Sequence, residues 1–169
     1  DTLVADLPEL TKEQSAAYNK ISNSENDQST FLLHGETGSG KTRLYIELAR
    51  DALKKNRSTL VLTPEISLTT PLAAQFEKVF GNKVYINHSS LTPKKRLEIW
   101  TKLLFSNDPI VLIGPRSSLF MPISKLGLIV VDEFHESAYK QESAPYYNSV
   151  RIASILANES GSKLILGSG

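Results

Sequence analysis

The stretch Gly35-Glu36-Thr37-Gly38-Ser39-Gly40-Lys41-Thr42 decides the fold, because it fits every fixed position of a phosphate-binding loop. Glycines present no Cβ and can adopt positive φ angles, so successive backbone N–H groups can turn toward an anionic phosphate. We expect Lys41 to reach the β- and γ-phosphates, and the Thr42 hydroxyl to ligate Mg²⁺ at the start of a helix. The predicted ligand is ATP with Mg²⁺, and the predicted phosphate-binding residues are Gly35, Glu36, Thr37, Gly38, Ser39, Gly40, Lys41 and Thr42.

A short apolar run precedes this loop and a helical pattern follows it. Thr30-Phe31-Leu32-Leu33 is typical of a short buried strand, and the apolar residues after the loop have the spacing of an amphipathic helix. Those helix residues are Leu44, Ile46, Leu48, Ala49 and Leu53. A flexible Gly/Ser turn that precedes a lysine by chance is the alternative. The order strand, glycine loop, helix favours phosphate binding, because that mechanism requires it.

Length and composition indicate one globular domain covering residues 1–169, since 40% of the residues are apolar. The net charge of +1 does not mark a strongly basic nucleic-acid binder, so any contact with DNA must be local. The absence of cysteine excludes disulfides and cysteine-ligated zinc within this chain and fits a reducing cytoplasm. No stretch has the length of a membrane span or the pattern of a signal segment. The first residue is not Met and the last residues follow a strand-like run, so we expect a piece of a larger protein.

Strand-like and helix-like segments alternate along the rest of the chain, which predicts an α/β fold with a mainly parallel sheet and helices on both faces. Helical patterns cover Leu68 to Phe80 and Pro93 to Phe105, and an earlier helix opens at Leu10 with Thr11 as N-cap and Gln14 completing a capping box. The predicted strands are 59–62, 84–86, 110–113, 128–131 and 164–166. In such a sheet, ligands gather beyond the carboxyl ends of the strands.

Two adjacent carboxylates follow one of the apolar runs, Leu128-Ile129-Val130-Val131. A phosphate-binding loop needs a carboxylate at a strand end to hold Mg²⁺, and Asp132 is placed for this role. Glu133 comes next and is our candidate general base for the water that attacks the γ-phosphate. An ordinary charged strand end or a helix N-cap is the alternative, and the phosphate-binding loop decides against it.

His135 is placed to couple this hydrolytic pair to a neighbouring element, and we count it with Lys41, Asp132 and Glu133 as a catalytic candidate. A single histidine after a strand is more often a surface or hydrogen-bonded residue, so both interpretations stay open.

Asp132-Glu133-Phe134-His135 resembles the DEAH/DEEH box of superfamily 2 helicases. Together with further segments of the chain, it resembles the PriA family of bacterial replication-restart helicases. Those segments are the phosphate-binding loop, Thr63-Pro64-Glu65-Ile66-Ser67-Leu68-Thr69, His88-Ser89-Ser90-Leu91, Arg116-Ser117-Ser118-Leu119-Phe120 and Ser137-Ala138-Tyr139-Lys140-Gln141. The resemblance runs from about Leu10 to the end of the chain and implies a RecA-like P-loop NTPase domain, the first of two helicase lobes.

The resemblance also implies roles for individual residues. Gln14 resembles a glutamine that reads adenine, although its place in the capping box explains it equally well. Further segments resemble motifs that contact single-stranded DNA, and Arg116 suits phosphate best because a guanidinium matches phosphate geometry. The implied DNA-binding residues are Pro64, Glu65, His88, Ser89, Arg116, Ser117, Tyr139, Lys140 and Tyr147. By composition alone, each of these segments is a polar surface loop.

The family further implies a cytoplasmic bacterial protein that unwinds DNA with 3'-5' polarity, together with other primosome proteins and single-strand-binding protein. The resemblance implies that the DNA substrate is single-stranded or forked. It also implies a zinc site in the parent protein and none in this piece. Because the second lobe supplies an arginine to the transition state, the isolated lobe is expected to be weakly active or inactive. Another superfamily 2 translocase or an RNA helicase is one alternative. A non-catalytic nucleotide-binding module is the other, for which Phe134 in the acidic box is the only hint.

Overall fold

The structure is a computed structural model, and it describes residues 7–24, 30–35, 40–64, 71–134 and 148–169. The described helices are α1 Lys12–Ser22, α2 Lys41–Lys54, α3 Pro71–Phe80, α4 Pro93–Phe105 and α5 Ser149–Ser160, with the 3₁₀ turns η1 Gly81–Lys83 and η2 Arg116–Phe120. The described strands are β1 Thr30–His34, β2 Ser58–Leu62, β3 Val84–Ile86, β4 Val111–Gly114, β5 Leu126–Val131 and β6 Lys163–Ser168.

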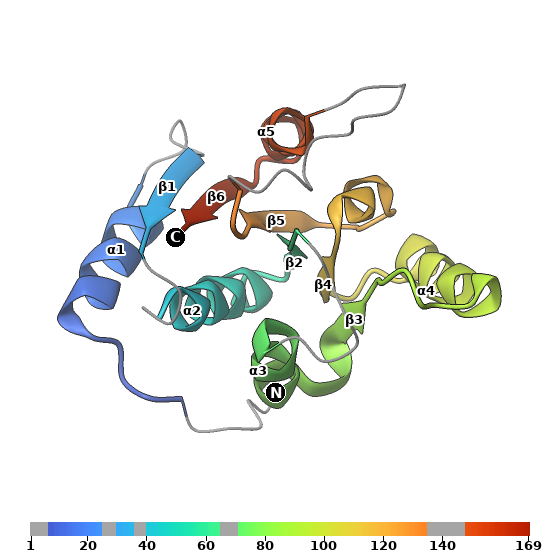
Figure 1. Ribbon diagram of the computed structural model, residues 1–169, viewed down its shortest axis with the longest axis horizontal. Helices are drawn as coiled ribbons and strands as arrows, with labels where there is room; N and C mark the ends of the chain where they lie inside the picture. Colours follow the sequence, from blue (N-terminus) through green and yellow to red (C-terminus); the bar gives the residue numbers. More distant parts are fainter. Residues whose placement is uncertain (1–6, 25–29, 36–39, 65–70, 135–147) are drawn as a thin grey trace.

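The described strands form one six-stranded sheet in the order β1-β6-β5-β2-β4-β3, and all five pairings are parallel. β1 and β3 lie at the two edges, while β6, β5, β2 and β4 fill the middle (Figure 1). Because every strand points the same way, all carboxyl ends meet at one end of the sheet. The predicted parallel sheet is therefore confirmed, and so is every predicted strand to within two residues at each end.

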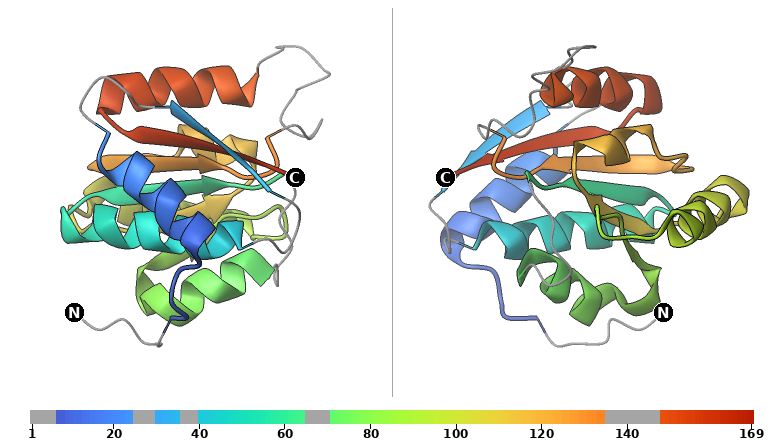
Figure 2. Two further views of the ribbon diagram at one scale, coloured as in Figure 1. Left: turned by 90° about the vertical axis from the view of Figure 1, so that its left-hand side faces the viewer. Right: turned by 45° about the vertical axis from the view of Figure 1, so that its right-hand side comes forward.

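Helices cover both faces of the sheet, as predicted. α2 and α3 lie on one face and α5 lies on the other (Figures 1 and 2). Alternate residues of each inner strand point to opposite faces: Val61 packs into the core under α2 and α3, whereas Leu60 and Leu62 pack into the core under α5. Burial on both faces explains why the inner strands are continuous apolar runs.

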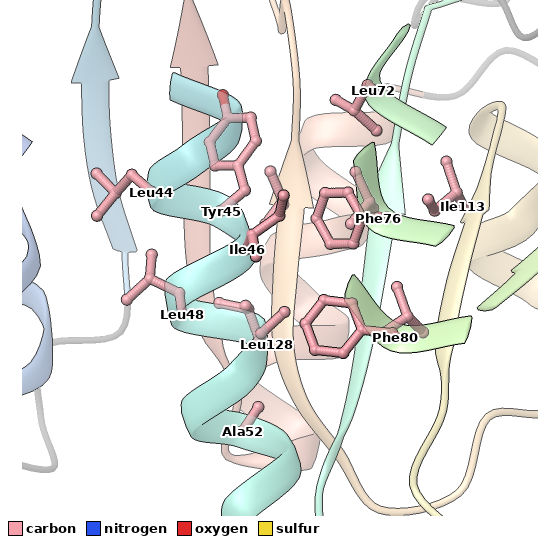
Figure 3. Close-up of a cluster of buried hydrophobic side chains, with 14 of the residues drawn as sticks. Leu44, Tyr45, Ile46, Leu48, Ala52, Leu72, Phe76, Phe80, Ile113 and Leu128 are labelled. Atoms are coloured by element: carbon pink, nitrogen blue, oxygen red, sulfur yellow. The ribbon is translucent and has the colours of Figure 1, made fainter. Parts of the chain in front are cut away.

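Side chains of α2 and α3 interlock over the first face (Figure 3). Phe76 and Phe80 of α3 lie 5.8 Å apart between ring centroids, and both are buried with Ile46 of α2. This core fixes the start of α2, and with it the position of the phosphate-binding loop, against the carboxyl ends of the strands.

Four helix ends follow the capping rules. At α1 the side chains of Thr11 and Gln14 make both bonds of the predicted capping box, and at α4 Thr92 caps a helix that begins at Pro93. α5 was not among the predicted helices, although Asn148 caps it and Gly161 ends it with a φ of 67°. Among the described residues, no helix has the length and apolar content to cross a bilayer.

Candidate nucleotide-binding site

The phosphate-binding loop begins where β1 ends. The backbone N–H of Gly35 donates to the carbonyl of Ser168 at 3.0 Å, which ties the start of the loop to the end of β6. Gly40 closes the loop as the N-cap of α2 with a φ of 92°, a left-handed conformation that favours glycine. The loop residues between them, 36–39, lie outside the described part of the chain. Of the two described loop glycines, Gly40 has the positive φ that the sequence pattern predicts and Gly35 does not.

Lys41 stands in the first turn of α2 and points back toward the loop. Its Nζ donates to the carbonyl of Gly35 at 2.5 Å and to that of Ser168 at 2.8 Å, and it lies 3.3 Å from Oε1 of Glu133. The Lys41 side chain is only 9% exposed, so its charge is held in a partly desolvated position at the mouth of the loop. Such an ammonium can exchange these partners for phosphate oxygens.

Asp132 and Glu133 form a turn directly after β5. The N–H of Asp132 donates to the carbonyl of Leu62 at 2.9 Å, and the N–H of Phe134 donates to that of Gly167 at 3.0 Å, so the turn is bonded to strands on both sides. Glu133 has a φ of 50°, a left-handed conformation that costs a non-glycine residue about 1–2 kcal/mol. This strained backbone accompanies the ion pair of Glu133 with Lys41.

These groups line one cavity of about 290 Å³. Its lining residues are Gly40, Lys41, Thr42, Arg43, Gln75, Asp132 and Glu133. The hydroxyl of Thr42 and the carboxylate of Asp132 are hard oxygen ligands of the kind that Mg²⁺ binds. The cavity therefore holds a cation for phosphate, two oxygen ligands for a metal and a second carboxylate from residues far apart in the sequence.

The carboxyl of Asp132 lies in a mixed electrostatic environment. Burial raises the pKa of Asp132 above its ordinary value, the hydrogen bond from Tyr45 opposes this rise, and the charges of Glu133 and Lys41 act in opposite directions. The hydroxyl of Tyr45 donates to Oδ1 of Asp132 at 2.8 Å. A bound cation would favour the ionised form of this carboxyl further.

Gln14 lies against the closing end of the loop. Its Oε1 accepts from the N–H of Thr11 at 2.8 Å, while its Nε2 donates to the carbonyl of Gly40 at 3.0 Å. The predicted capping role is thus confirmed, and the same side chain also reaches the loop. To read adenine, Gln14 would have to exchange one of these two contacts.

Gln14→Ala and Thr11→Ala separate the two contacts of the Gln14 amide. Both substitutions break the capping box and are expected to destabilise the protein by about 1 kcal/mol. Only Gln14→Ala also removes the bond to Gly40, and it should weaken nucleotide binding about fivefold, the equivalent of about 1 kcal/mol. Titration with a fluorescent ATP analogue measures this difference, and equal affinities of the two variants would show that the loop contact has no effect on the nucleotide.

Five of the predicted DNA-contacting residues belong to the described part of the chain, and they follow strands in the other half of the same sheet. Pro64, His88 and Arg116 each come two residues after the end of β2, β3 and β4, and these three strands are neighbours in the sheet. The bond from Thr63 N to Gly114 O, at 3.0 Å, continues the pairing of β2 with β4 beyond the strand. The structure therefore brings these three residues to the carboxyl ends of β2, β4 and β3. The other half of the sheet, formed by β1, β6 and β5, carries the cavity.

Exposure differs among these residues. Ser89 and Ser117 are exposed, Pro64 and Arg116 are half-buried, and His88 is only 7% exposed. Nδ1 of His88 has no hydrogen-bond partner within the described residues. Glu65, Tyr139, Lys140 and Tyr147, and the catalytic candidate His135, lie outside the described residues.

Sequence reasoning missed four contributors to the site. Tyr45 bonds to Asp132, Ser168 offers its carbonyl to Lys41, Gly167 accepts from the acidic turn, and Gln75 lines the cavity from α3. Gly167 and Ser168 have a sequence signal, because both follow the predicted strand 164–166. The others occupy positions that a single sequence does not distinguish from core or surface.

Comparison with known proteins identifies a family and several relatives. The family described as type III restriction enzyme, res subunit, matches residues 7–167. The replication restart protein PriA of Bacillus subtilis is 38% identical over 161 residues, which are 94% of this chain and 20% of that protein. PriA of Synechocystis sp. is 42% identical over 162 residues, 95% of this chain and 19% of that protein. The chain thus spans about a fifth of the length of these relatives.

Solved structures show the same fold. The helicase domain of Hef from Pyrococcus furiosus superposes with a TM-score of 0.64 at 23% identity, covering 92% of this chain and 31% of that one. The UvsW helicase of bacteriophage T4 gives a TM-score of 0.63 at 18% identity, covering 94% and 52%. The predicted RecA-like fold and the predicted resemblance to PriA are both confirmed. Since the family match extends over nearly the whole chain, this protein belongs to the family described as type III restriction enzyme, res subunit.

Proposed function

We propose that this chain is the ATP-binding lobe of a DNA helicase that couples ATP hydrolysis to translocation on DNA and to unwinding during restart of stalled replication forks. The observation that carries the proposal is the convergence of Lys41, Thr42, Asp132 and Glu133 on one cavity at the carboxyl ends of the strands. PriA relatives support replication restart in particular, although they are matched over only about a fifth of their length.

Each of these residues has a chemical task in the proposed reaction. Lys41 would neutralise charge on the β- and γ-phosphates, and Thr42 and Asp132 would hold Mg²⁺, which would supply positive charge to the phosphate oxygens. Glu133 orients the attacking water and accepts its proton. When ATP enters, Lys41 leaves the carboxylate of Glu133 for phosphate, and Glu133 becomes available to the water. His135 is proposed to transmit this state to a neighbouring element.

The carboxyl ends of β2, β4 and β3, next to the cavity, are proposed to hold single-stranded DNA. Pro64 follows the end of β2, Arg116 and Ser117 follow β4, and Ser89 follows β3, and these strands are neighbours in the order β2-β4-β3 beside β5. A strand of DNA laid along these strand ends would contact the end of β2, where the carbonyl of Leu62 accepts from the N–H of Asp132. The proposal includes Glu65, His88, Tyr139, Lys140 and Tyr147 as further contacts.

The parent protein is proposed to supply what the lobe lacks. A second lobe would add the arginine that stabilises the transition state, so this chain of residues 1–169 alone would turn over ATP weakly or not at all. We also propose that the parent protein has a zinc site and 3'-5' polarity and that it lies in the cytoplasm of a bacterium. Its proposed partners are single-stranded or forked DNA, other primosome proteins and single-strand-binding protein.

Hydrolysis by the full-length protein with Glu133→Gln tests the proposed general base. The amide keeps the size of the side chain but accepts no proton, so DNA-stimulated ATPase activity should fall at least about 10²-fold, within the range typical of general-base removal. Nucleotide affinity should stay within about threefold, because the phosphate contacts remain. A wild-type protein whose hydrolysis does not respond to single-stranded DNA would contradict the proposed motor function on DNA.

A further inference from the structure

Tyr45 lies in the protein interior, directly behind the carboxylate of Asp132. The side chain is fully buried and stands on α2, one helical turn after Thr42 (Figure 3). Its hydroxyl donates to Oδ1 of Asp132 at 2.8 Å. A buried phenol needs a hydrogen-bond partner, and here that partner is the proposed magnesium ligand.

Gly167 of β6 makes room for this hydroxyl. A Cβ at position 167 would lie 1.8 Å from Oη of Tyr45 and 3.3 Å from Oδ1 of Asp132, and no side chain fits at the first of these distances. Gly167 lies within a strand and is not among the described glycines with positive φ, so its backbone conformation does not demand glycine. The absence of a side chain at position 167 therefore leaves the space that the Tyr45 hydroxyl occupies.

The bond from Tyr45 restricts how the carboxylate can turn. A carboxylate that is held through one oxygen keeps its other oxygen in a fixed direction, and partners of this kind orient metal ligands in proteins. Tyr45 also connects three parts of the site: the helix that begins with Lys41 and Thr42, the acidic turn, and the strand whose last carbonyl accepts from Lys41.

We propose that Tyr45 is a positioning residue for magnesium, which holds the Asp132 carboxylate in its metal-binding orientation, and that residue 167 is glycine to admit the Tyr45 hydroxyl. This inference rests on the proposed function in one respect, the role of Asp132 as a metal ligand. A phenol that merely fills the core is the competing explanation. The two differ in what loss of the hydroxyl alone would do, since phenylalanine keeps the ring and its packing.

The test uses Tyr45→Phe in the full-length protein, with Mn²⁺ as a spectroscopically visible probe for Mg²⁺. Free Mn²⁺ is measured by electron paramagnetic resonance in the presence of ADP, so the readout requires no hydrolysis. We expect Tyr45→Phe to weaken Mn²⁺ binding about tenfold, the lower end of what loss of such a partner costs. Nucleotide binding without metal should stay unchanged.

Tyr18→Phe is the matched control. The hydroxyl of Tyr18 on α1 donates to Asp51, a carboxylate on α2, the helix that carries Tyr45, but neither Tyr18 nor Asp51 lines the nucleotide cavity. Tyr18→Phe should bind Mn²⁺ as the wild type does. Equal Mn²⁺ affinity in wild type and Tyr45→Phe would overturn the inference, and so would an equal loss in the two phenylalanine variants.

Gly167→Ala tests the second half of the inference. The new methyl group should displace the hydroxyl and weaken Mn²⁺ binding by at least as much as Tyr45→Phe does. In the Tyr45→Phe background, the same methyl group meets no hydroxyl, so Gly167→Ala should there add less than a further threefold loss. A full additional loss in the double variant would overturn the claim that Gly167 admits the Tyr45 hydroxyl.

Failure of the inference and failure of the proposed function give different results. If the wild-type protein shows DNA-stimulated ATP hydrolysis and Tyr45→Phe binds Mn²⁺ as tightly as wild type, only the positioning role of Tyr45 is refuted. If the variants show the expected losses of Mn²⁺ affinity but the wild-type protein shows no DNA-stimulated hydrolysis, only the proposed motor function is refuted. A wild-type protein that binds no Mn²⁺ beside ADP overturns the role of Tyr45 together with that of Asp132.

Discussion

Lys41→Ala will lower DNA-stimulated ATP hydrolysis by the full-length protein about 10²- to 10³-fold, which is what loss of one preorganised charge-stabilising group typically costs. Lys41 is the only cation whose contacts join the loop carbonyl of Gly35, the end of β6 and Glu133 among the described residues. Arg43 also lines the cavity, but its guanidinium donates to the carbonyl of Pro8 and to the carboxylate of Glu47. Steady-state hydrolysis and titration with a fluorescent ATP analogue together measure the effect on turnover and on binding.

Lys54→Ala is the control for this substitution, because Lys54 is exposed at the far end of the same helix. It removes the same charge and the same methylene groups, so net charge changes equally in both variants. We expect its hydrolysis to lie within about twofold of wild type, since surface changes away from a site have small effects. If Lys41→Ala hydrolysed ATP as fast as Lys54→Ala, the cavity would not be the site of hydrolysis.

Phe76→Ala will destabilise the chain by about 3–5 kcal/mol, the usual cost of removing a fully buried aromatic ring. Phe76 is 0% exposed and packs against Phe80 between α3 and the sheet (Figure 3). The cavity left behind would lie inside a core that is already close-packed and can collapse only partly. Urea unfolding followed by circular dichroism gives the change in the free energy of unfolding.

Phe105→Ala removes the same ring from a site that is 79% exposed, at the end of α4. The free energy of unfolding should change by less than about 0.5 kcal/mol, because little apolar surface is returned to water. A small cost at Phe76, or equal costs at the two positions, would mean that α3 does not pack on the sheet as described.

Much of the fold could be predicted from the sequence because its signals are local. The short apolar runs of β2, β4 and β5 are rich in β-branched residues, and Pro93 marks the start of α4 at the correct residue. α5 was missed although Asn148 caps it, because its apolar residues are spread among serine and asparagine. Strand order could not be predicted at all, since β1 pairs with β6 across more than 130 residues of sequence.

In the candidate site too, residues with local sequence signals could be predicted and residues that depend on long-range contacts could not. Lys41, Thr42, Asp132 and Glu133 could be predicted because each stands in a short motif with a chemical reason for its spacing. Tyr45 and the residues of β6 could not, because their roles depend on contacts between segments that meet only in the folded sheet. The bond between Tyr45 and Asp132 spans 87 positions, and that between Lys41 and Ser168 spans 127.

A crystal structure of the chain with Mg²⁺ and a non-hydrolysable ATP analogue tests the central claim most directly. We predict the β- and γ-phosphates beside Lys41, with Mg²⁺ bound by the Thr42 hydroxyl and the Asp132 carboxylate. Nζ of Lys41 should then have left Oε1 of Glu133, 3.3 Å away in the structure described above. A nucleotide bound elsewhere, or a Lys41 that keeps its contacts to Glu133 and Ser168 while the analogue is bound, would contradict the account.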